Sequence, residues 1–117
     1  MKRPGTTVIF FRRSDGNLIG YQAQGHTGYA EAGADIVCAA ISALTQATLN
    51  GLKGVLKAPV MFDQDDQRAF LEARLTAEAT EAQVQQAQLL LVTLQEALQA
   101  IQRSYPQNVR IFFEERR

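Results

Sequence analysis

The chain begins with two short runs of the residue types that favour strands. TTVIFFRR (6–13) is rich in β-branched and aromatic residues, and LIGYQAQG (18–25) alternates large with polar or small ones. Between them, SDGN (14–17) carries an Asp-Gly turn signal. Two strand-like runs around such a turn predict a β-hairpin.

A helical spacing of apolar positions follows a glycine-rich stretch. We predict a helix from Ile36 to about Asn50, with Asp35 as its N-cap. The remaining helical positions are mostly alanine, and no charged residue lies between Ile36 and Asn50. A helix that is small and uncharged all round is expected to be covered on most sides, in the centre of the molecule or in part at a subunit interface. Its apolar stripe, spaced by threes and fours, consists of Val37, Ile41, Leu44, Thr48 and Leu52.

The second half of the chain predicts a strand region, a long helix and a final strand. PVMF (59–62) predicts a short strand paired with AFLEARLTA (69–77), and DQDDQ (63–67) predicts an acidic turn between them. Apolar residues repeat by threes and fours over Glu81–Ser104, which predicts a helix. NVRIFFEER (108–116) predicts the last strand.

The predicted element order is therefore β-β-α-β(-β)-α-β. Mixed ordering of this kind indicates an α+β fold, with two helices packed on a mixed sheet of four or five strands. The chain has 117 residues, enough for one domain with a core, and contains no internal repeat or interdomain linker. We expect residues 1–117 to form a single domain.

Composition narrows the possible partners and compartments. Twelve Lys+Arg balance twelve Asp+Glu, so we expect no direct binding to nucleic acid. The start, MKRPGTT, leads into a strand-like run instead of the apolar core of a signal peptide. No apolar stretch approaches the ~18 residues of a membrane span. We therefore expect a cytoplasmic protein without membrane contact, whose single cysteine stays reduced.

The only histidine and the only cysteine both lie in GHTGYAEAGADIVCAAIS (25–42). The thiolate is the reactive form of cysteine, and a helix N-terminus or a neighbouring histidine favours it. With Asp35 as cap, Cys38 is expected in the first helical turn, whose free amides favour an anion and can hold an oxyanion. His26 lies twelve positions earlier, across a loop of glycines and small residues that can bring the imidazole to the sulfur. Ser42 follows one turn later and can hydrogen-bond near the reacting centre or back to its own helix.

Spacing alone also allows an ordinary structural role for each of these residues. A lone cysteine among Val, Ala and Ile is commonly a small buried hydrophobe, and a lone loop histidine is commonly a surface residue. Asp35 can act as a helix cap alone. The acidic stretch 63–67 lacks the glycine and distal glutamate of a calcium loop, which favours a solvated turn. We expect no metal and no cofactor.

The string GHTGYAEAGADIVCAAISAL closely resembles the signature of the bacterial ribosomal-processing cysteine protease family, Prp. That signature is a Gly-His-small-Gly-Tyr segment, a short loop ending in glycine, and then Asp-hydrophobic-Val-Cys-Ala-small-hydrophobic-Ser. Thr27 stands where the family more often has alanine. Length, element order and the long second helix also resemble the family, so the resemblance covers essentially the whole chain. The matching positions are Gly25, His26, Gly28, Tyr29, Gly33, Asp35, Val37, Cys38, Ala39 and Ser42.

The resemblance implies a cysteine endopeptidase with a Cys–His dyad. Cys38 would be the nucleophile, and His26 the general base and later the acid that protonates the leaving amine. Asp35 and Ser42 would orient the dyad and the helix start. The implied substrate loop, which opens and closes over the site, contains Gly25, Gly28, Tyr29 and Gly33.

The resemblance also implies a substrate and an assembly. The substrate would be a large-subunit ribosomal protein, of the bacterial L twenty-seven type, from which the protease removes a short N-terminal extension after a Phe-rich segment. Family members form homodimers, and the uncharged first helix suits such burial. Two other classes of function stay open: a non-catalytic ribosome-associated binding protein of the same fold, and a thiol redox sensor that uses Cys38, for which the chain offers no resolving cysteine.

Overall fold

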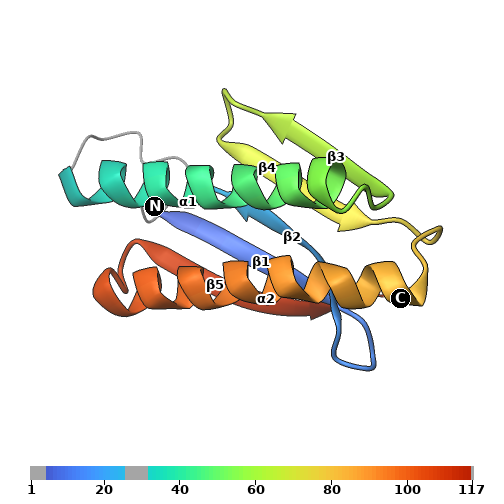
Figure 1. The fold of residues 1–117 in the computed structure, drawn as a ribbon. Helices are drawn as coiled ribbons and strands as arrows, with labels where there is room; N and C mark the ends of the chain where they lie inside the picture. The colour runs from blue at the N-terminus through green and yellow to red at the C-terminus, as the bar shows by residue number, and fades with distance from the viewer. Residues whose placement is uncertain (1–4, 26–31, 117) are drawn as a thin grey trace.

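Two helices lie side by side over one face of a five-stranded sheet (Figure 1). The computed structural model describes residues 5–25 and 32–116, and for residues 32–35 the backbone alone. This arrangement confirms the predicted α+β class and element order. The elements are β1 Thr6–Arg12, β2 Leu18–Gln24, α1 Ala32–Asn50, a π-helical turn η1 Gly51–Val55, β3 Val60–Asp65, β4 Phe70–Leu75, α2 Glu81–Ser104 and β5 Val109–Glu115.

The sheet is mixed, with strand order β3-β4-β2-β1-β5. β1 and β2 form the predicted hairpin, and β3 and β4 form a second antiparallel hairpin joined to the first through the β2–β4 pair. β5 pairs parallel to β1, which is possible because α2 returns the chain to the opposite edge. One sheet thus joins the two ends of the chain.

The core lies between the sheet and the two helices. Alternate residues of the central strands face the helices, such as Val8 and Phe10 of β1 and Tyr21 of β2, and all three are fully buried. The Thr80 hydroxyl caps α2 by accepting a hydrogen bond from the amide of Gln83 at 3.1 Å, and the Gln83 side chain returns the contact. The buried stripe of α2 consists of Val84, Ala87, Leu91, Leu94 and Leu98.

The first helix begins earlier than predicted. Its first residue is Ala32 and not Ile36, so Asp35 lies within the first helical turn and is not the N-cap. Alanine is the strongest helix former, and a single glycine costs only about 1 kcal/mol, so Ala32-Gly33-Ala34 extends the helix. As a consequence, Cys38 lies in the second turn, and Gly33 belongs to the helix and not to the preceding loop.

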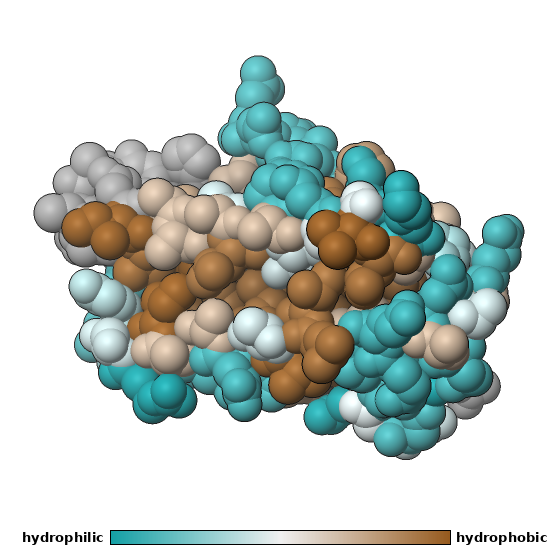
Figure 2. All heavy atoms as spheres, viewed as in Figure 1, coloured by the Kyte–Doolittle hydropathy of each residue, from teal (hydrophilic) through white to brown (hydrophobic). Residues whose placement is uncertain are grey.

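Only one side of α1 is covered within the described chain, so the helix does not lie in the centre of the molecule, which was one of the two expected positions. Val37 and Ile41 are each 2% exposed, whereas Ile36 is 62% exposed. The helix lies on one face of a single sheet, so its opposite side meets solvent. That side is uncharged, and Figure 2 shows the pale and brown apolar strip that it forms with the groove between the helices. No helix among the described residues is long and apolar enough to span a membrane.

The acidic stretch 63–67 is a strand end followed by a turn, and not a turn throughout as predicted. Residues 63–65 belong to β3, where Asp63 pairs with Glu72 and Asp65 with Phe70. β3 is an edge strand, so the carboxylates along it reach solvent without a desolvation cost. The turn itself is stabilised by Asp65, whose Oδ1 accepts hydrogen bonds from the amides of residues 67 and 68.

Candidate active site

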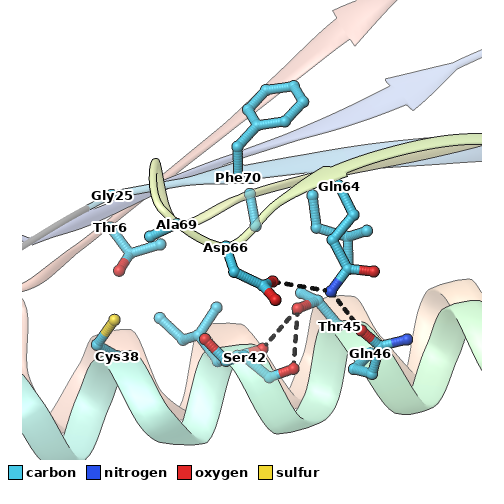
Figure 3. Close-up of a pocket in the computed structure, with 13 residues that line it drawn as sticks. Thr6, Gly25, Cys38, Ser42, Thr45, Gln46, Gln64, Asp66, Ala69 and Phe70 are labelled. Atoms are coloured by element: carbon cyan, nitrogen blue, oxygen red, sulfur yellow. Dashed lines mark hydrogen bonds between the residues drawn. The ribbon is translucent and has the colours of Figure 1, made fainter.

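A cavity of about 340 Å³ opens between α1 and the ends of β1, β2 and the β3–β4 hairpin (Figure 3). One wall is the outer edge of the buried stripe of α1. The other wall consists of strand ends and the β3–β4 turn. The cavity is lined by Thr6, Ala23, Gly25, Cys38, Ile41, Ser42, Thr45, Gln46, Gln64, Asp66, Ala69, Phe70 and Leu71.

Cys38 presents its thiol to this cavity. The residue is half-buried and free of any disulfide. Its side chain points from α1 toward the strand wall near Thr6 (Figure 3). It lies beside the buried Val37 at the border of the packed stripe, which leaves the sulfur open to a ligand in the cavity. A thiol placed in this way is accessible for chemistry and does not fill the core.

His26, Gly28 and Tyr29 lie outside the described residues, but the residue that precedes His26 lines the cavity. Gly25 donates its amide to the carbonyl oxygen of Ala69 at 3.2 Å. A Cβ on Gly25 would lie 2.4 Å from the carbonyl oxygen of Gly5, so only glycine fits where the end of β2 passes close to the start of β1. Close packing, and not freedom of movement, therefore accounts for the glycine at this position.

The predicted supporting residues differ in where they lie. Ser42 lines the cavity one turn after Cys38, and its carbonyl oxygen accepts a hydrogen bond from the Thr45 hydroxyl at 3.3 Å. The same hydroxyl donates to the carbonyl oxygen of Ile41 at 2.8 Å. The backbone of Asp35 is helical, and its side chain lies outside the described part of the structure. Of the two, Ser42 is thus seen in the cavity wall.

A buried tyrosine fixes α1 against the sheet beneath the cavity. The phenol of Tyr21 donates to the carbonyl oxygen of Thr45 at 2.6 Å, and Tyr21 is fully buried. Burial raises the pKa of Tyr21 far above its ordinary value, which keeps the phenol protonated as a donor. The helix that carries Cys38 is therefore tied to β2 by a hydrogen bond shielded from water.

Sequence reasoning missed the contribution of the β3–β4 hairpin to the cavity. The side-chain amide of Gln64 donates to Oε1 of Gln46 at 2.9 Å and to Oδ1 of Asp66 at 3.2 Å, which links the hairpin to α1 (Figure 3). Nothing in the acidic stretch 63–67 alone indicates that it faces a helix. That contact depends on the antiparallel pairing of β3 with β4, which places Gln64 beside Leu71 on the helix side.

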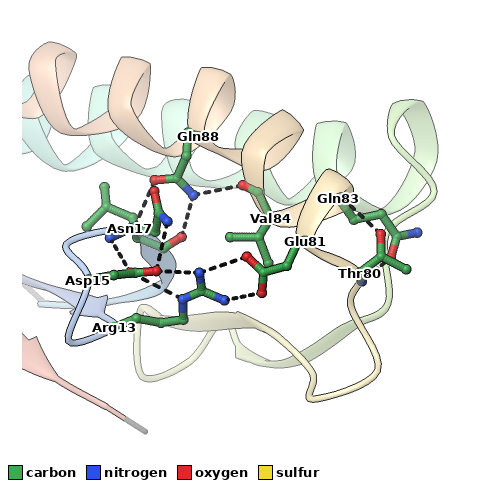
Figure 4. Close-up of polar contacts among 9 residues, drawn as sticks. Arg13, Asp15, Asn17, Thr80, Glu81, Gln83, Val84 and Gln88 are labelled. Carbon is green, nitrogen blue, oxygen red and sulfur yellow. Dashed lines mark hydrogen bonds and ion pairs between the residues drawn. The ribbon is translucent and has the colours of Figure 1, made fainter.

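A second polar cluster lies outside the cavity and joins the first hairpin to α2 (Figure 4). The Arg13 guanidinium donates to both carboxylate oxygens of Glu81, at 2.9 and 3.1 Å, and also pairs with Asp15. Arg13 lowers the pKa of Asp15 to about 2 and lowers the pKa of Glu81. Each charge in this cluster has a partner, so its role is structural.

The comparisons with known proteins agree with this geometry. The family model described as "Cysteine protease Prp" matches residues 6–110, nearly the whole described chain. The "Ribosomal processing cysteine protease Prp" of Staphylococcus aureus is 29% identical over 105 residues, which is 90% of this chain and 95% of that protein. The protein of the same name from Bacillus subtilis is 25% identical over 100 residues, 86% of this chain and 89% of that protein.

Solved structures agree as well. The crystal structure of the S. aureus protease in complex with a substrate peptide superposes with a TM-score of 0.80 and 28% identity, covering 93% of this chain and 99% of that one. A second structure of that protease, with a covalently linked product peptide, gives a TM-score of 0.78 over the same shares. Because the family model spans residues 6–110 and the fold is the same, this chain belongs to the cysteine protease Prp family.

Proposed function

We propose that this chain is a cysteine endopeptidase that removes a short N-terminal extension from a large-subunit ribosomal protein of the bacterial L twenty-seven type. One observation carries the proposal: the half-buried thiol of Cys38 faces a cavity whose wall contains Gly25, the residue bonded to His26. The names of the S. aureus and B. subtilis relatives support ribosomal processing as the task. We treat residues 1–117 as one Prp-like protease domain acting in the cytoplasm.

The proposed reaction uses a Cys–His dyad. His26 takes the proton of the Cys38 thiol as Sγ attacks the scissile carbonyl carbon, and then gives this proton to the leaving amine. The C–N bond breaks, and the extension remains as a thioester on Cys38. Water, deprotonated by His26, attacks the thioester and releases the extension as a free acid with the thiol restored. The covalently linked product peptide in the S. aureus protease supports a covalent route.

Activation of the thiol falls chiefly to His26 in this proposal. The dipole of a helix acts mainly within its first turn, and the free amides of a helix that begins at Ala32 come before Cys38. Cys38 lies one turn further along, where its own amide is used within the helix. A nearby imidazole is then the remaining group that favours the thiolate.

The other motif residues take supporting parts. Because α1 begins at Ala32, Asp35 is free of the capping role, and we assign it to orienting the dyad. Ser42, which lines the cavity one turn after Cys38, is assigned to holding the substrate backbone. Gly28 and Tyr29 are assigned to the segment that covers the bound peptide. Gly25 forms its fixed base.

We also propose that the protein is a homodimer through the uncharged side of α1. Apolar side chains that remain exposed on the helix layer include Ile36, Val55 and Leu89, at 62%, 79% and 74% exposure. A charge-free helix face beside such residues is unusual for a surface meant to meet water (Figure 2). Ala43→Glu on this face is expected to convert a dimer to a monomer in light scattering, and a monomeric wild type would contradict this part of the proposal.

The test of the protease proposal is cleavage of the ribosomal protein in its extended form. The wild type, Cys38→Ala and His26→Ala are each incubated with it under reducing conditions, and the product masses are read. The expected result is a single cut behind the Phe-rich segment by the wild type and none by Cys38→Ala. Folding of both variants is checked by thermal unfolding.

The same experiment decides between the protease and the other two classes. If the wild type and both variants bind the extended ribosomal protein and none of them cleaves it, the chain is a ribosome-associated binding module. Reversible oxidation of Cys38 without any cleavage would point to a thiol sensor. Either outcome contradicts the protease proposal.

A further inference from the structure

Asp66 is the one acidic or basic side chain among the described residues that line the cavity, apart from the Cys38 thiol. The remaining lining residues are small, apolar, or neutral polar ones such as Gln46 and Gln64. Asp66 lies in the wall formed by the β3–β4 turn, opposite the α1 wall that carries Cys38, and its carboxylate points toward α1 (Figure 3). Among the described lining residues, a peptide held against Cys38 therefore meets one negative charge, that of Asp66.

One hydrogen bond, from Gln64, restrains this carboxylate. Gln64 has two side-chain N–H groups, and they donate to Asp66 Oδ1 at 3.2 Å and to Gln46 Oε1 at 2.9 Å. Both donors of Gln64 are thus used, and the relay ends on α1. Asp66 keeps its second oxygen and its formal charge without a protein donor among the described residues.

Two cations near the turn, Arg68 of the hairpin and Lys53 of η1, make other contacts. Arg68, two positions along the turn, lies 3.8 Å from the carboxylate of Asp65 and 4.9 Å over the ring of Phe70. Lys53 lies 4.3 Å over the ring of Phe62. Within the described residues, no Lys or Arg pairs with Asp66. Among the described residues, the charge of Asp66 therefore has no counter-ion.

We propose that Asp66 is a specificity residue whose carboxylate receives a lysine or arginine side chain of the peptide substrate. This rests on the proposed protease function. A cation from the substrate would supply a partner for this carboxylate, and the hydrogen bond from Gln64 would limit its reorganisation on binding. Asp66 thus selects for charge near the scissile bond, beside the apolar contacts that the cavity makes through residues such as Ile41 and Leu71.

The test uses pairs of peptides that span the cleavage point, each with lysine or its neutral acetylated form at one position at a time. We measure kcat/KM with the wild type, with Asp66→Asn and with Asp63→Asn. Asparagine keeps an oxygen for Gln64 to donate to, so Asp66→Asn removes the charge alone. Asp63 is exposed on the edge strand outside the cavity lining and gives the matched control.

We expect the wild type to prefer lysine over acetyl-lysine by about fivefold at one position, an advantage of the size expected for a partly exposed charge pair. The preference should disappear in Asp66→Asn, persist in Asp63→Asn, and weaken as salt is raised. A wild type that shows no preference at any position would overturn the inference. An equal loss on both peptides in Asp66→Asn would also overturn it, because that result indicates a role in positioning the machinery.

Failure of the protease proposal itself is recognised separately. If the wild type cleaves no peptide, the same pairs are tested for binding to Cys38→Ala and to Cys38→Ala combined with Asp66→Asn, by fluorescence anisotropy. Tighter binding of the lysine form that requires Asp66 would support the charge selectivity without catalysis. Equal binding of both forms would contradict it.

Discussion

Replacing Gly25 by alanine tests whether the close approach of the end of β2 to the start of β1 positions the segment that carries His26. The added Cβ would lie 2.4 Å from the carbonyl oxygen of Gly5 and 2.5 Å from Cα of Thr6. Ordinary Cβ contacts begin at about 3.4 Å, so the backbone must move by roughly 1 Å. Both neighbours are backbone atoms, so no side-chain rotation relieves the overlap.

Overpacking of this kind costs on the order of 1–3 kcal/mol. In a domain of this size, each kcal/mol lowers Tm by about 4 °C, so we expect a fall of roughly 4–12 °C by circular dichroism. Cleavage at 25 °C should also fall if the proposed dyad is correct, because Gly25 is bonded to His26 and its displacement would disturb the imidazole that the mechanism requires. The two readouts separate stability from positioning.

Gly54→Ala is the matched control for this substitution. Nothing lies within 4 Å of a Cβ built on Gly54, so this variant should unfold at or slightly above the wild-type temperature and cleave normally. If Gly25→Ala kept the Tm and the cleavage rate of the wild type, the close contact with Gly5 and Thr6 would not require glycine at this position. Equal losses in both glycine variants would contradict this requirement too, since the contact would then not be the cause.

Three further predictions concern stability. Tyr21→Phe should cost about 1 kcal/mol in urea unfolding, because it removes one buried hydrogen bond. The raised folded pKa of Tyr21 means that wild-type stability is held below about pH 10 and falls as the pH rises further, and this fall should be smaller in the variant. Asp15 and Glu81 have lower pKa values in the folded protein than in the unfolded chain, so their pairing with Arg13 stabilises the fold above about pH 4, and this stabilisation is lost as the pH falls toward 2. Arg13→Gln removes the pairing, so its free energy of unfolding should fall less between pH 7 and pH 3 than that of the wild type. Thr80→Ala should cost about 1 kcal/mol by removing the cap of α2, and an unchanged urea midpoint would contradict that role.

Strong periodicity made the second helix predictable from sequence. The apolar repeat predicts Glu81–Ser104, and α2 has those bounds. The predicted start of the first helix was wrong, because the preference of Asp35 for the N-cap outweighed the helix propensity of Ala32-Gly33-Ala34 in the prediction. The error changes the chemistry, since it moves Cys38 from the first turn to the second.

Only the part of the site that lies in the motif, residues 25–42, was predictable from sequence. Cys38 is found at a cavity, as expected for the nucleophile that the motif implies. Gln64 and Asp66 could not be assigned to that cavity, because their place depends on the register of β3 against β4. A one-residue slip of that register would turn Gln64 away from α1, and no local pattern in the stretch 63–67 fixes it.

In the proposed mechanism, Cys38 forms a covalent bond with the peptide that it cuts. The most direct measurement is the intact mass of the protein, quenched in acid during turnover of the extended ribosomal protein. The proposed mechanism requires a transient species heavier by the mass of the extension less one water, attached at Cys38, and absent from Cys38→Ala. Cleavage that proceeds undiminished in Cys38→Ala, with no adduct in the wild type, would contradict it.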